Sequence, residues 1–346
     1  MTTKNMEIDY NGLMLISEGH AAFQVLWAAV ELGVFEALSE HPGMTRAEIA
    51  ERLTLQEQPT RILMVALAAL GLVRKEGDNF FNAALTEEYL IGDKPGSLAP
   101  VLGWQHYIVY PGLIDFVEAM KEGTNVGLKH FPGEGDRLYQ RLVSHPKIEK
   151  VFQDAMSALS QQANTQLVES LDLAGVTHLM DVGGGDATNA IRFARKFPHL
   201  KVTVFDSPSI CRIAQENIAK QGMEDRVDTV PGDLFTTQYP ADIDAIIYCH
   251  MFTIWSPEEN QRILQKTCEA LPKGGMAIIF NMMGNDDDTG PISTALGSLY
   301  FLTIATGKGM LYSWRDYEEW MRTAGFSGVK RIEGLPMEHG VFIGIK

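Results

Sequence analysis

Short apolar segments alternate with amphipathic segments through the second half of the chain, and this alternation restricts the fold more than any other feature. Six apolar segments have the length and composition of strands: 178–182, 201–206, 226–230, 244–250, 276–283 and 341–346. The segments between them carry apolar residues at helical spacing: 187–197, 210–222 and 258–271. Strands that alternate with helices predict an α/β fold with a doubly wound, mostly parallel sheet covered on both faces.

The most specific motif is Met180–Asp186, in which three glycines follow the first strand. Gly183, Gly184 and Gly185 allow the backbone to approach a ligand closely, and the helix that follows offers free N–H groups. The motif is not G-x-G-x-x-G, its acid Asp181 precedes the turn, and the chain has no P-loop. The turn therefore favours a nucleotide site that does not hold a dinucleotide.

Two further acids follow the next two strands. Asp206 ends the second strand about 20 residues beyond the glycines, where a carboxylate can bind both hydroxyls of a ribose. Asp233 follows the third strand, where it can accept a hydrogen bond from the exocyclic amine of adenine. Either acid alone is more typical of a strand-end cap. Three acids at successive strand ends, counting Asp181, predict an adenosine site without a bound pyrophosphate.

The first third of the chain has a helical pattern. Apolar spacing predicts a helix over Ala21–Leu38. Thr45 begins a second helix through a capping box with Glu48, and Pro59 begins a third. A turn and an aromatic pair then predict a small β wing. This is the winged-helix pattern, and because the third helix is almost wholly apolar, it favours dimerisation over DNA binding.

Four motifs identify a family when they are taken together. They are Asp-Val-Gly-Gly-Gly from Asp181, Phe-Asp-x-Pro from Phe205, Gly-Asp-x-Phe from Gly232 and x-x-Trp-x-x-Glu around Trp255. With them the chain resembles the small-molecule O-methyltransferases that use S-adenosylmethionine, which include plant phenylpropanoid enzymes and bacterial enzymes that tailor antibiotics and pigments. The resemblance covers nearly the whole chain, because this family also has an N-terminal winged-helix dimerisation region.

The resemblance implies three segments, a cofactor and a homodimer. We expect a dimerisation domain over 1–95, helices that link it and line the substrate pocket over 96–172, and the methyltransferase domain over 173–346. S-adenosyl-L-methionine is the expected cofactor and S-adenosyl-L-homocysteine the product. The residues implied at the cofactor are Met156, Ser160, Asp181, Gly183, Gly184, Gly185, Asp206, Ser207, Gly232, Asp233, Leu234, Phe235, Cys249 and His250.

The family's general base is missing from this sequence. Plant members carry His-Asp-Trp after the fourth strand, and alignment on Trp255 places Thr253 at the position of that histidine. The acidic partners of the histidine are missing too, since Asn281 and Leu311 fall near their positions. A neutral threonine hydroxyl is a very poor base.

Three interpretations of this loss remain open. First, the substrate hydroxyl is itself acidic, so that orientation beside the sulfonium is sufficient. Second, His250 or His106 serves as a relocated base; the alternative role of His250 is contact with the cofactor or structural support. Third, the scaffold has abandoned O-methylation for C-methylation or for pericyclic or hydroxylating chemistry assisted by the cofactor. We favour the first interpretation, with the second as a refinement.

The expected substrate is a small flat aromatic or heteroaromatic hydroxyl compound of secondary metabolism, such as the hydroxypyrrole of prodigiosin-type pigments. Aromatic and apolar side chains suit such a guest. The residues that we expect to line its pocket are Trp104, His106, Tyr107, Phe152, Met156, Phe252, Thr253, Trp255, Met282, Leu296 and Tyr300.

Composition excludes several other classes. A formal net charge of −15 argues against a nucleic-acid partner, and this disfavours a winged-helix regulator that senses a ligand. No stretch reaches the roughly 20 apolar residues that span a bilayer. Three cysteines match no disulfide framework or zinc site, so we expect no metal. With no export signal at the start of the chain, the expected location is the cytoplasm.

Overall fold

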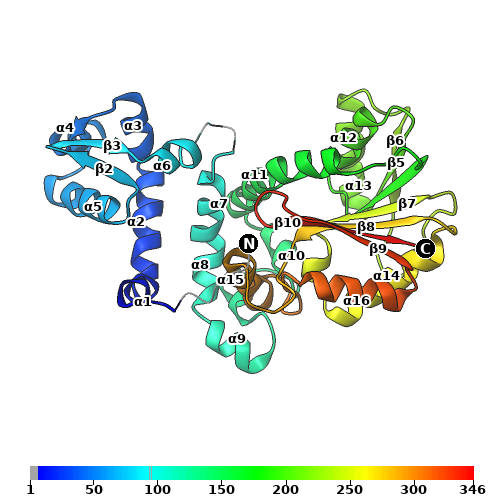
Figure 1. Cartoon of the computed structure of the whole chain (residues 1–346). Helices are drawn as coiled ribbons and strands as arrows, with labels where there is room; N and C mark the ends of the chain where they lie inside the picture. Colours follow the sequence, from blue (N-terminus) through cyan, green and yellow to red (C-terminus); the bar gives the residue numbers. More distant parts are fainter. Residues whose placement is uncertain (1–6, 93, 95) are drawn as a thin grey trace. The chain divides into compact units, whose positions relative to one another are not determined.

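The computed structural model describes residues 7–92, 94 and 96–346, and of 160–162 it describes the backbone alone. The chain forms two compact units (Figure 1). The first unit runs to Tyr110 and includes His145–Gln161, and the second unit comprises Pro111–Ser144 and Gln162–Lys346. Helix α11 (Pro146–Ser170) thus contributes to both units. The predicted domain boundaries after residues 95 and 172 stay a prediction.

The first unit consists of helices and a small antiparallel sheet. The sheet has the strand order β1-β3-β2 (Met44–Thr45, Asn79–Asn82, Val73–Glu76), and its β2–β3 hairpin confirms the predicted β wing. Its helices are α1 (Tyr10–Ser17), α2 (Gly19–Glu31), α3 (Val34–Glu40), α4 (Arg46–Arg52), α5 (Glu57–Ala69), α6 (Ala84–Tyr89), α7 (Ala99–Trp104) and the π-helix η1 (Gln105–Val109).

Local sequence signals explain where these helices begin and end. The capping box of Thr45 and Glu48 is present at the start of α4, as predicted. The single helix predicted over Ala21–Leu38 is wrong, because Gly33 adopts a left-handed conformation with φ 73° and separates α2 from α3. Apolar spacing continued through this break, and spacing alone does not detect one glycine that changes the direction of the chain.

The second unit is built on a seven-stranded sheet with the order β6-β5-β4-β7-β8-β10-β9. The first five strands in this order pair in parallel, whereas β10 pairs antiparallel with both β8 and β9. The bounds are β4 His178–Val182, β5 Lys201–Asp206, β6 Val227–Pro231, β7 Ala245–Cys249, β8 Met276–Met282, β9 Gly328–Ile332 and β10 His339–Ile345. Strand β9 was not predicted, and β10 begins two residues before the predicted strand.

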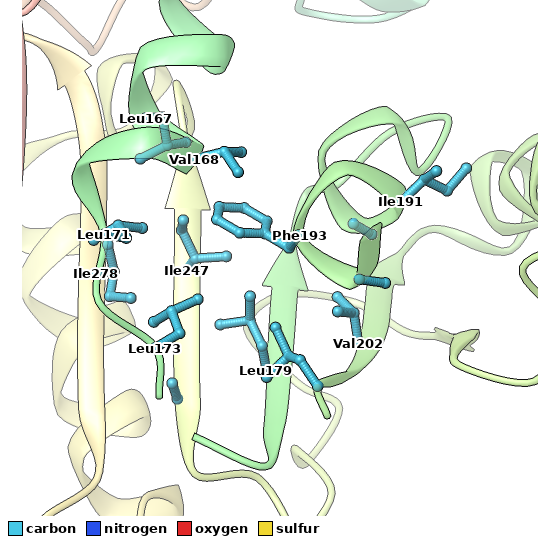
Figure 2. Packing of buried hydrophobic residues seen from close by; sticks show 14 of the residues in the cluster. Leu167, Val168, Leu171, Leu173, Leu179, Ile191, Phe193, Val202, Ile247 and Ile278 are labelled. Carbon is cyan, nitrogen blue, oxygen red and sulfur yellow. The ribbon is translucent and has the colours of Figure 1, made fainter. Parts of the chain in front are cut away.

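Helices cover both faces of the sheet, which confirms the doubly wound arrangement. One core joins the end of α11, α12 (Thr188–Lys196) and α13 (Pro208–Lys220) to the strands. Figure 2 shows Phe193 of α12 packed among Leu167, Val168 and Ile247 of this core. The opposite core joins α14 (Pro257–Ala270) and α16 (Trp314–Ala324) to the other face.

The remaining helices of the second unit are short. They are α8 (Tyr110–Leu113), α9 (Phe116–Glu122), η2 (Val126–His130), α10 (Leu138–Leu142), η3 (Phe252–Ile254), α15 (Ile292–Tyr300) and the π-helix η4 (Phe301–Ala305). Within the described parts of the chain no single helix could cross a membrane by length and apolar character, although α1 and α2, bent by 65°, meet that test as a pair.

Candidate active site

The carboxyl ends of β6, β5, β4 and β7 lie side by side, and backbone hydrogen bonds join the loops after β4 and β6 to the end of β5. The amide of Gly183 donates to the carbonyl of Phe205 (2.8 Å), and the amide of Gly232 donates to the carbonyl of Asp206 (2.9 Å). Most of the residues predicted at the cofactor lie on or just after these strand ends. They are Asp181, Gly183, Gly184, Gly185, Asp206, Ser207, Gly232, Asp233, Leu234, Phe235, Cys249 and His250.

Asp181 is a buried carboxyl at the centre of this edge. Its side chain has no exposed surface, and neither carboxylate oxygen has a hydrogen-bond partner among the residues that the structure describes. Burial raises the pKa of the Asp181 carboxyl to about 7, and the charges of Asp206 and Asp186 add to the shift. Buried polar atoms without partners are rare in folded proteins, so Asp181 is suited to a ligand that brings hydrogen-bond donors.

Asp206 stands at the end of β5 beside the glycine turn. Its two carboxylate oxygens accept hydrogen bonds from the amides of Ser207 (2.7 Å) and Gly185 (3.2 Å). Burial raises the pKa of Asp206, and these two hydrogen bonds oppose the rise. The carboxylate is therefore held in place by the backbone of the turn.

Asp233 differs from Asp206 because it lies on the surface and caps its own loop. One of its oxygens, Oδ1, accepts hydrogen bonds from the amides of Phe235 and Thr236 (both 3.0 Å) and from the Thr236 hydroxyl (2.9 Å). The Thr236 hydroxyl is the main cause of a lowered pKa at Asp233. The carboxylate is thus ionised and fixed in orientation.

The glycine turn approaches its surroundings too closely for side chains. A Cβ on Gly184 would lie 2.8 Å from Cγ of Asp181, and one on Gly183 would lie 2.8 Å from Cγ of Met251. Gly183 and Gly185 both have a positive φ, of 72° and 59°. At Gly185, in contrast, no described atom lies within 4 Å of the position that a Cβ would take. The turn is therefore closed beneath and open on one side, as a ligand cradle requires.

Thr253, at the position of the family's base, is committed to the protein itself. Its side chain is 4% exposed, and its Oγ1 donates a hydrogen bond to the carbonyl of His250 (3.2 Å). The backbone of Gly309 lies close against that of Thr253: a Cβ on Gly309 would lie 1.9 Å from the Thr253 carbonyl oxygen. Thr253 thus closes the turn after β7.

His250 follows β7 in a left-handed conformation with φ 55°, which is rare for a residue other than glycine. Its amide donates to the carbonyl of Phe280 (2.9 Å), and its Nε2 is buried without a partner in the described chain. Burial, with a smaller effect from His339, lowers the pKa of the His250 imidazole to about 3. His250 is accordingly neutral at pH 7 and a weak proton acceptor.

The two positions that we expect to correspond to the acidic partners of the family's base are buried. Asn281 of β8 has no exposed surface, and its Nδ2 donates to the hydroxyl of Tyr317 (3.1 Å). Leu311 is 8% exposed. Neither position supplies an acidic partner to an imidazole.

Trp255 and Phe252 lie next to Thr253 but have different surroundings. The Trp255 ring contacts Phe235 edge-on at 4.9 Å between centroids, and the guanidinium of Arg137 lies 4.8 Å from its centre. Phe252 has no exposed surface and packs against Tyr248, as a core residue does. Their place in a substrate pocket stays a prediction.

The predicted pocket residues of the first unit form an aromatic group around η1. His106 stacks on Trp27 of α2 at 5.0 Å, and Tyr107 contacts both rings edge-on. Of the other residues predicted in this unit, Trp104 is buried, Phe152 and Met156 are half-buried on α11, and the Ser160 side chain lies outside the described part of the chain.

The other predicted pocket residues of the second unit lie on β8 and α15. Met282 is half-buried at the end of β8 and Leu296 is 61% exposed. Tyr300 is buried and forms a hydrogen bond with Tyr139 of α10. Tyr300 directly precedes the π-helix η4, and His106 and Tyr107 lie within the π-helix η1. Short π-helical segments are frequent at functional sites.

Sequence reasoning missed several residues at this edge. Asn189 of α12 forms a hydrogen bond with Cys249, and burial raises the pKa of that thiol. His339 contacts both His250 and Phe280. The predicted last strand began at residue 341, so His339 fell outside every predicted element. The described residues include no group of three or more His, Cys, Asp or Glu side chains arranged to hold a metal ion.

A mixed seven-stranded sheet with a glycine turn and acids at successive strand ends is the fold of a protein that binds an adenosine-containing ligand, and comparison with known proteins specifies the class. An O-methyltransferase domain matches residues 113–327 and an O-methyltransferase dimerisation domain matches residues 14–92. The chain belongs to this family of methyltransferases, and its cofactor is S-adenosylmethionine.

Individual relatives differ in the atom that they methylate. The chain is 39% identical to an L-tyrosine C(3)-methyltransferase of Streptomyces lavendulae, over 99% of this chain and 95% of that protein. It is 33% identical to a 3-hydroxy-5-methyl-1-naphthoate 3-O-methyltransferase of Streptomyces sahachiroi, over 93% and 91% of the two chains. The crystal structure of the S-adenosylmethionine-dependent methyltransferase SibL is similar, with a TM-score of 0.88, 38% identity and coverage of 98% and 99%.

Proposed function

We propose that the protein transfers a methyl group from S-adenosylmethionine to a ring carbon beside the hydroxyl of a small phenolic acceptor related to tyrosine. One observation carries this proposal: Thr253 is buried with its hydroxyl bonded to the His250 carbonyl, while the cofactor motifs at the strand ends are intact. Such a site supports methyl transfer but has no strong base to remove a phenolic proton.

The residues at the sheet edge fit the cofactor. We propose that Asp206 accepts hydrogen bonds from its ribose and that Asp233 accepts one from its adenine amine. The turn Gly183–Gly185 would hold the methionine part, and the carboxylate of Asp181, which is buried without a partner among the described residues, would gain one there. The bound cofactor supplies an electrophilic methyl group. Charge-assisted hydrogen bonds of this kind are about twice as strong as neutral ones.

Carbon is an acceptor that does not need a strong base before the transfer. The oxygen of a phenol donates electron density to the neighbouring ring carbons, so these carbons are nucleophilic. The ring carbon would bond to the methyl carbon as the bond between that methyl carbon and the sulfonium sulfur breaks, which leaves S-adenosylhomocysteine. The ring carbon would then lose its proton to water, which restores aromaticity. Orientation of the two reacting carbons can contribute much of the rate, and the neutral His250 can accept a hydrogen bond at the rim. The 39% identity to a tyrosine C-methyltransferase supports carbon as the acceptor.

The test uses L-tyrosine that carries deuterium at both ring carbons beside the hydroxyl-bearing carbon, together with cofactor labelled with carbon-13 in its methyl group. Transfer to carbon gives an aryl methyl signal in the NMR spectrum and the loss of one deuterium. Transfer to oxygen gives a methoxy signal and retains both. If neither tyrosine nor its ring-hydroxylated and dipeptide derivatives accept the label, the proposed acceptor class is wrong.

O-methylation of an acidic aromatic hydroxyl is the second candidate. The 33% identity to a naphthoate O-methyltransferase and the description of the matched domain favour it. An acidic phenol loses its proton in water, so it also tolerates the absence of a base. A methoxy product from hydroxynaphthoate or hydroxypyrrole acceptors, with no product from tyrosine, decides for this candidate.

We also propose that the protein works as a homodimer through the first unit. Helix α1 and Ile8 just before it present apolar side chains to solvent, of which Tyr10 is 75% and Ile16 69% exposed. Exposed apolar groups of this extent mark an association surface, and this segment overlaps the matched dimerisation domain. Ile62 and Val65 on α5 are also more than half exposed, which suits a protein partner better than the phosphates of DNA. Sedimentation as a monomer at micromolar concentration contradicts the proposal.

A further inference from the structure

A second histidine lies against His250 and belongs to none of the motifs discussed so far. The ring of His339, the first residue of β10, meets the ring of His250 edge-on, with 5.1 Å between centroids and 85° between planes. Both rings contact Phe280 of β8, at 5.0 Å for His339 and 5.1 Å for His250. We refer to His250 and His339 as the histidine pair.

The backbone adopts conformations that cost energy at His250 itself and at the two residues before His339. His250, Met337 and Glu338 each have φ 55°. A residue other than glycine in the left-handed region costs roughly 1–3 kcal/mol and persists where the surroundings impose it, often at functional sites. Met337 and Glu338 directly precede His339, so this strained turn determines where the His339 ring lies.

The hydrogen bonds of the pair leave one nitrogen of each ring available. Nδ1 of His339 bonds to the Pro336 carbonyl (2.9 Å), and because a carbonyl can only accept, Nδ1 is the donor. His339 is 2% exposed. Its Nε2, like that of His250, is buried without a hydrogen-bond partner among the residues described here. Two neighbouring buried rings with unused nitrogens are not explained by the stability of the fold.

We propose that His339 is a positioning residue for methyl transfer: its ring, anchored at Pro336 and stacked on Phe280, holds His250 in the orientation that serves the cofactor and the acceptor. His339 need not touch either molecule. It fixes the ring plane of His250 in the way that a residue behind a metal-binding histidine fixes that ligand. The proposal depends on methyltransferase activity but not on which acceptor is methylated.

Four variants separate the ring of His339 from its hydrogen bond and from simple stability. His339→Phe keeps a ring but loses the bond to Pro336. His339→Asn keeps a donor near the position of Nδ1 but loses the ring. His339→Ala removes both. His178→Ala is the matched control, since His178 is another buried histidine of the same sheet, 7% exposed, that begins β4 at the opposite end.

The readouts are the affinity for S-adenosylhomocysteine by calorimetry and the ring signal of His250 by NMR with ring-labelled histidine. The signal is assigned from its loss in His250→Gln, and each protein is measured well below its melting temperature. We expect His339→Ala and His339→Asn to broaden or shift the His250 signal and to weaken binding by roughly 10-fold or more. His339→Phe should retain most of the affinity, and His178→Ala should retain all of it.

Two results overturn the proposal. One is a folded His339→Asn or His339→Ala protein with an unchanged His250 signal and unchanged affinity. The other is an equal loss of affinity in His178→Ala, which would show that any damage to the sheet weakens binding. If His339→Ala does not fold, the comparison of His339→Asn with His339→Phe decides the question.

Discussion

Both ends of the large sheet carry histidine and aspartate side chains that are buried or half-buried. Those at the amino end are hydrogen-bonded within the protein, whereas several at the carboxyl end keep atoms that are unpaired among the described residues. At the amino end, His178 contacts the Thr203 hydroxyl through Nε2 (2.7 Å) and the Asp242 carboxylate through Nδ1 (3.2 Å). Asp244 there accepts hydrogen bonds from the amides of Thr177 and His178 (2.8 and 3.0 Å). At the carboxyl end, Asp181 and the histidine pair keep buried atoms that find no partner within the described chain.

This difference separates polar groups that are hydrogen-bonded within the fold from unpaired groups that we propose serve a ligand. A buried polar group that is hydrogen-bonded to the protein is nearly neutral or favourable for stability, whereas an unpaired one costs about 1–3 kcal/mol. The amino end of the sheet contributes to stability, and the carboxyl end retains unpaired groups that destabilise the fold. We expect mutations at the two ends to separate stability from cofactor binding.

The largest expected effect concerns Asp181 and pH. Because the pKa of this carboxyl is about 7 in the folded chain against 3.8 when unperturbed, the folded state binds the proton more tightly than the unfolded state. The contribution of Asp181 to stability is therefore fully present below about pH 4 and is lost as pH rises to about 7, by at most about 4 kcal/mol. Chemical denaturation across this range should show the fall in the wild type relative to Asp181→Asn.

The Asp181→Asn variant controls for the other titrating groups, because it retains all of them. The lowered pKa of His250 acts in the opposite direction below neutral pH, but it is common to both proteins. We expect the variant to be the more stable protein above about pH 7 and to bind S-adenosylhomocysteine more weakly. A stability difference that does not change with pH would show that Asp181 is paired in solution.

His178→Ala tests the amino end of the sheet. It removes one of the two side-chain partners of Thr203 and the partner of Asp242, and it leaves a buried cavity, so we expect a loss of about 3 kcal/mol in the free energy of unfolding. Cofactor affinity should be unchanged at temperatures where the variant is folded. A large loss of affinity here would remove the distinction between the two ends.

Asp206→Ala makes the converse test at the carboxyl end. We expect binding of S-adenosylmethionine to weaken by about 2 kcal/mol or more, as for a pair of charge-assisted hydrogen bonds. The free energy of unfolding should change less than in His178→Ala. Calorimetry and denaturation on the same samples give both quantities, and an unchanged affinity would exclude the ribose assignment.

The smallest effect is expected at Thr253, which lies at the carboxyl edge but is satisfied by the protein. Thr253→Val keeps the shape and loses one bond to the His250 carbonyl, so methyl transfer should fall by no more than about 10-fold. Loss of a general base costs roughly 10²–10⁴-fold. A loss in that range with intact cofactor binding would make Thr253 essential to the chemistry and contradict our interpretation.

Local patterns predicted most of the fold and the cofactor edge. The strand and helix periods, the glycine turn and the acids at the strand ends are each set by neighbouring residues, and the sheet then brings their ends together. Residues brought together by tertiary structure were not predicted. His339 lies 89 positions after His250 in the sequence and meets it only because β10 pairs antiparallel with β8.

The direction in which a side chain points within a turn could not be predicted from the sequence either. The sequence predicted Thr253 just after the strand β7, at the edge of the site. Its bond to the His250 carbonyl and its close approach to Gly309 depend on how η3 and the loop after η4 pack together. Gly33 was missed for the related reason that apolar spacing does not report backbone direction.

The contact between Gly309 and Thr253 restricts what an engineer can change at this turn. A Cβ at residue 309 would lie 1.9 Å from the Thr253 carbonyl oxygen, so any side chain at residue 309 forces the two backbones apart. The Thr253 side chain is 4% exposed, so a larger side chain at that position must fit into a space that is already filled. A histidine introduced at position 253 therefore needs accompanying changes in the residues packed around it.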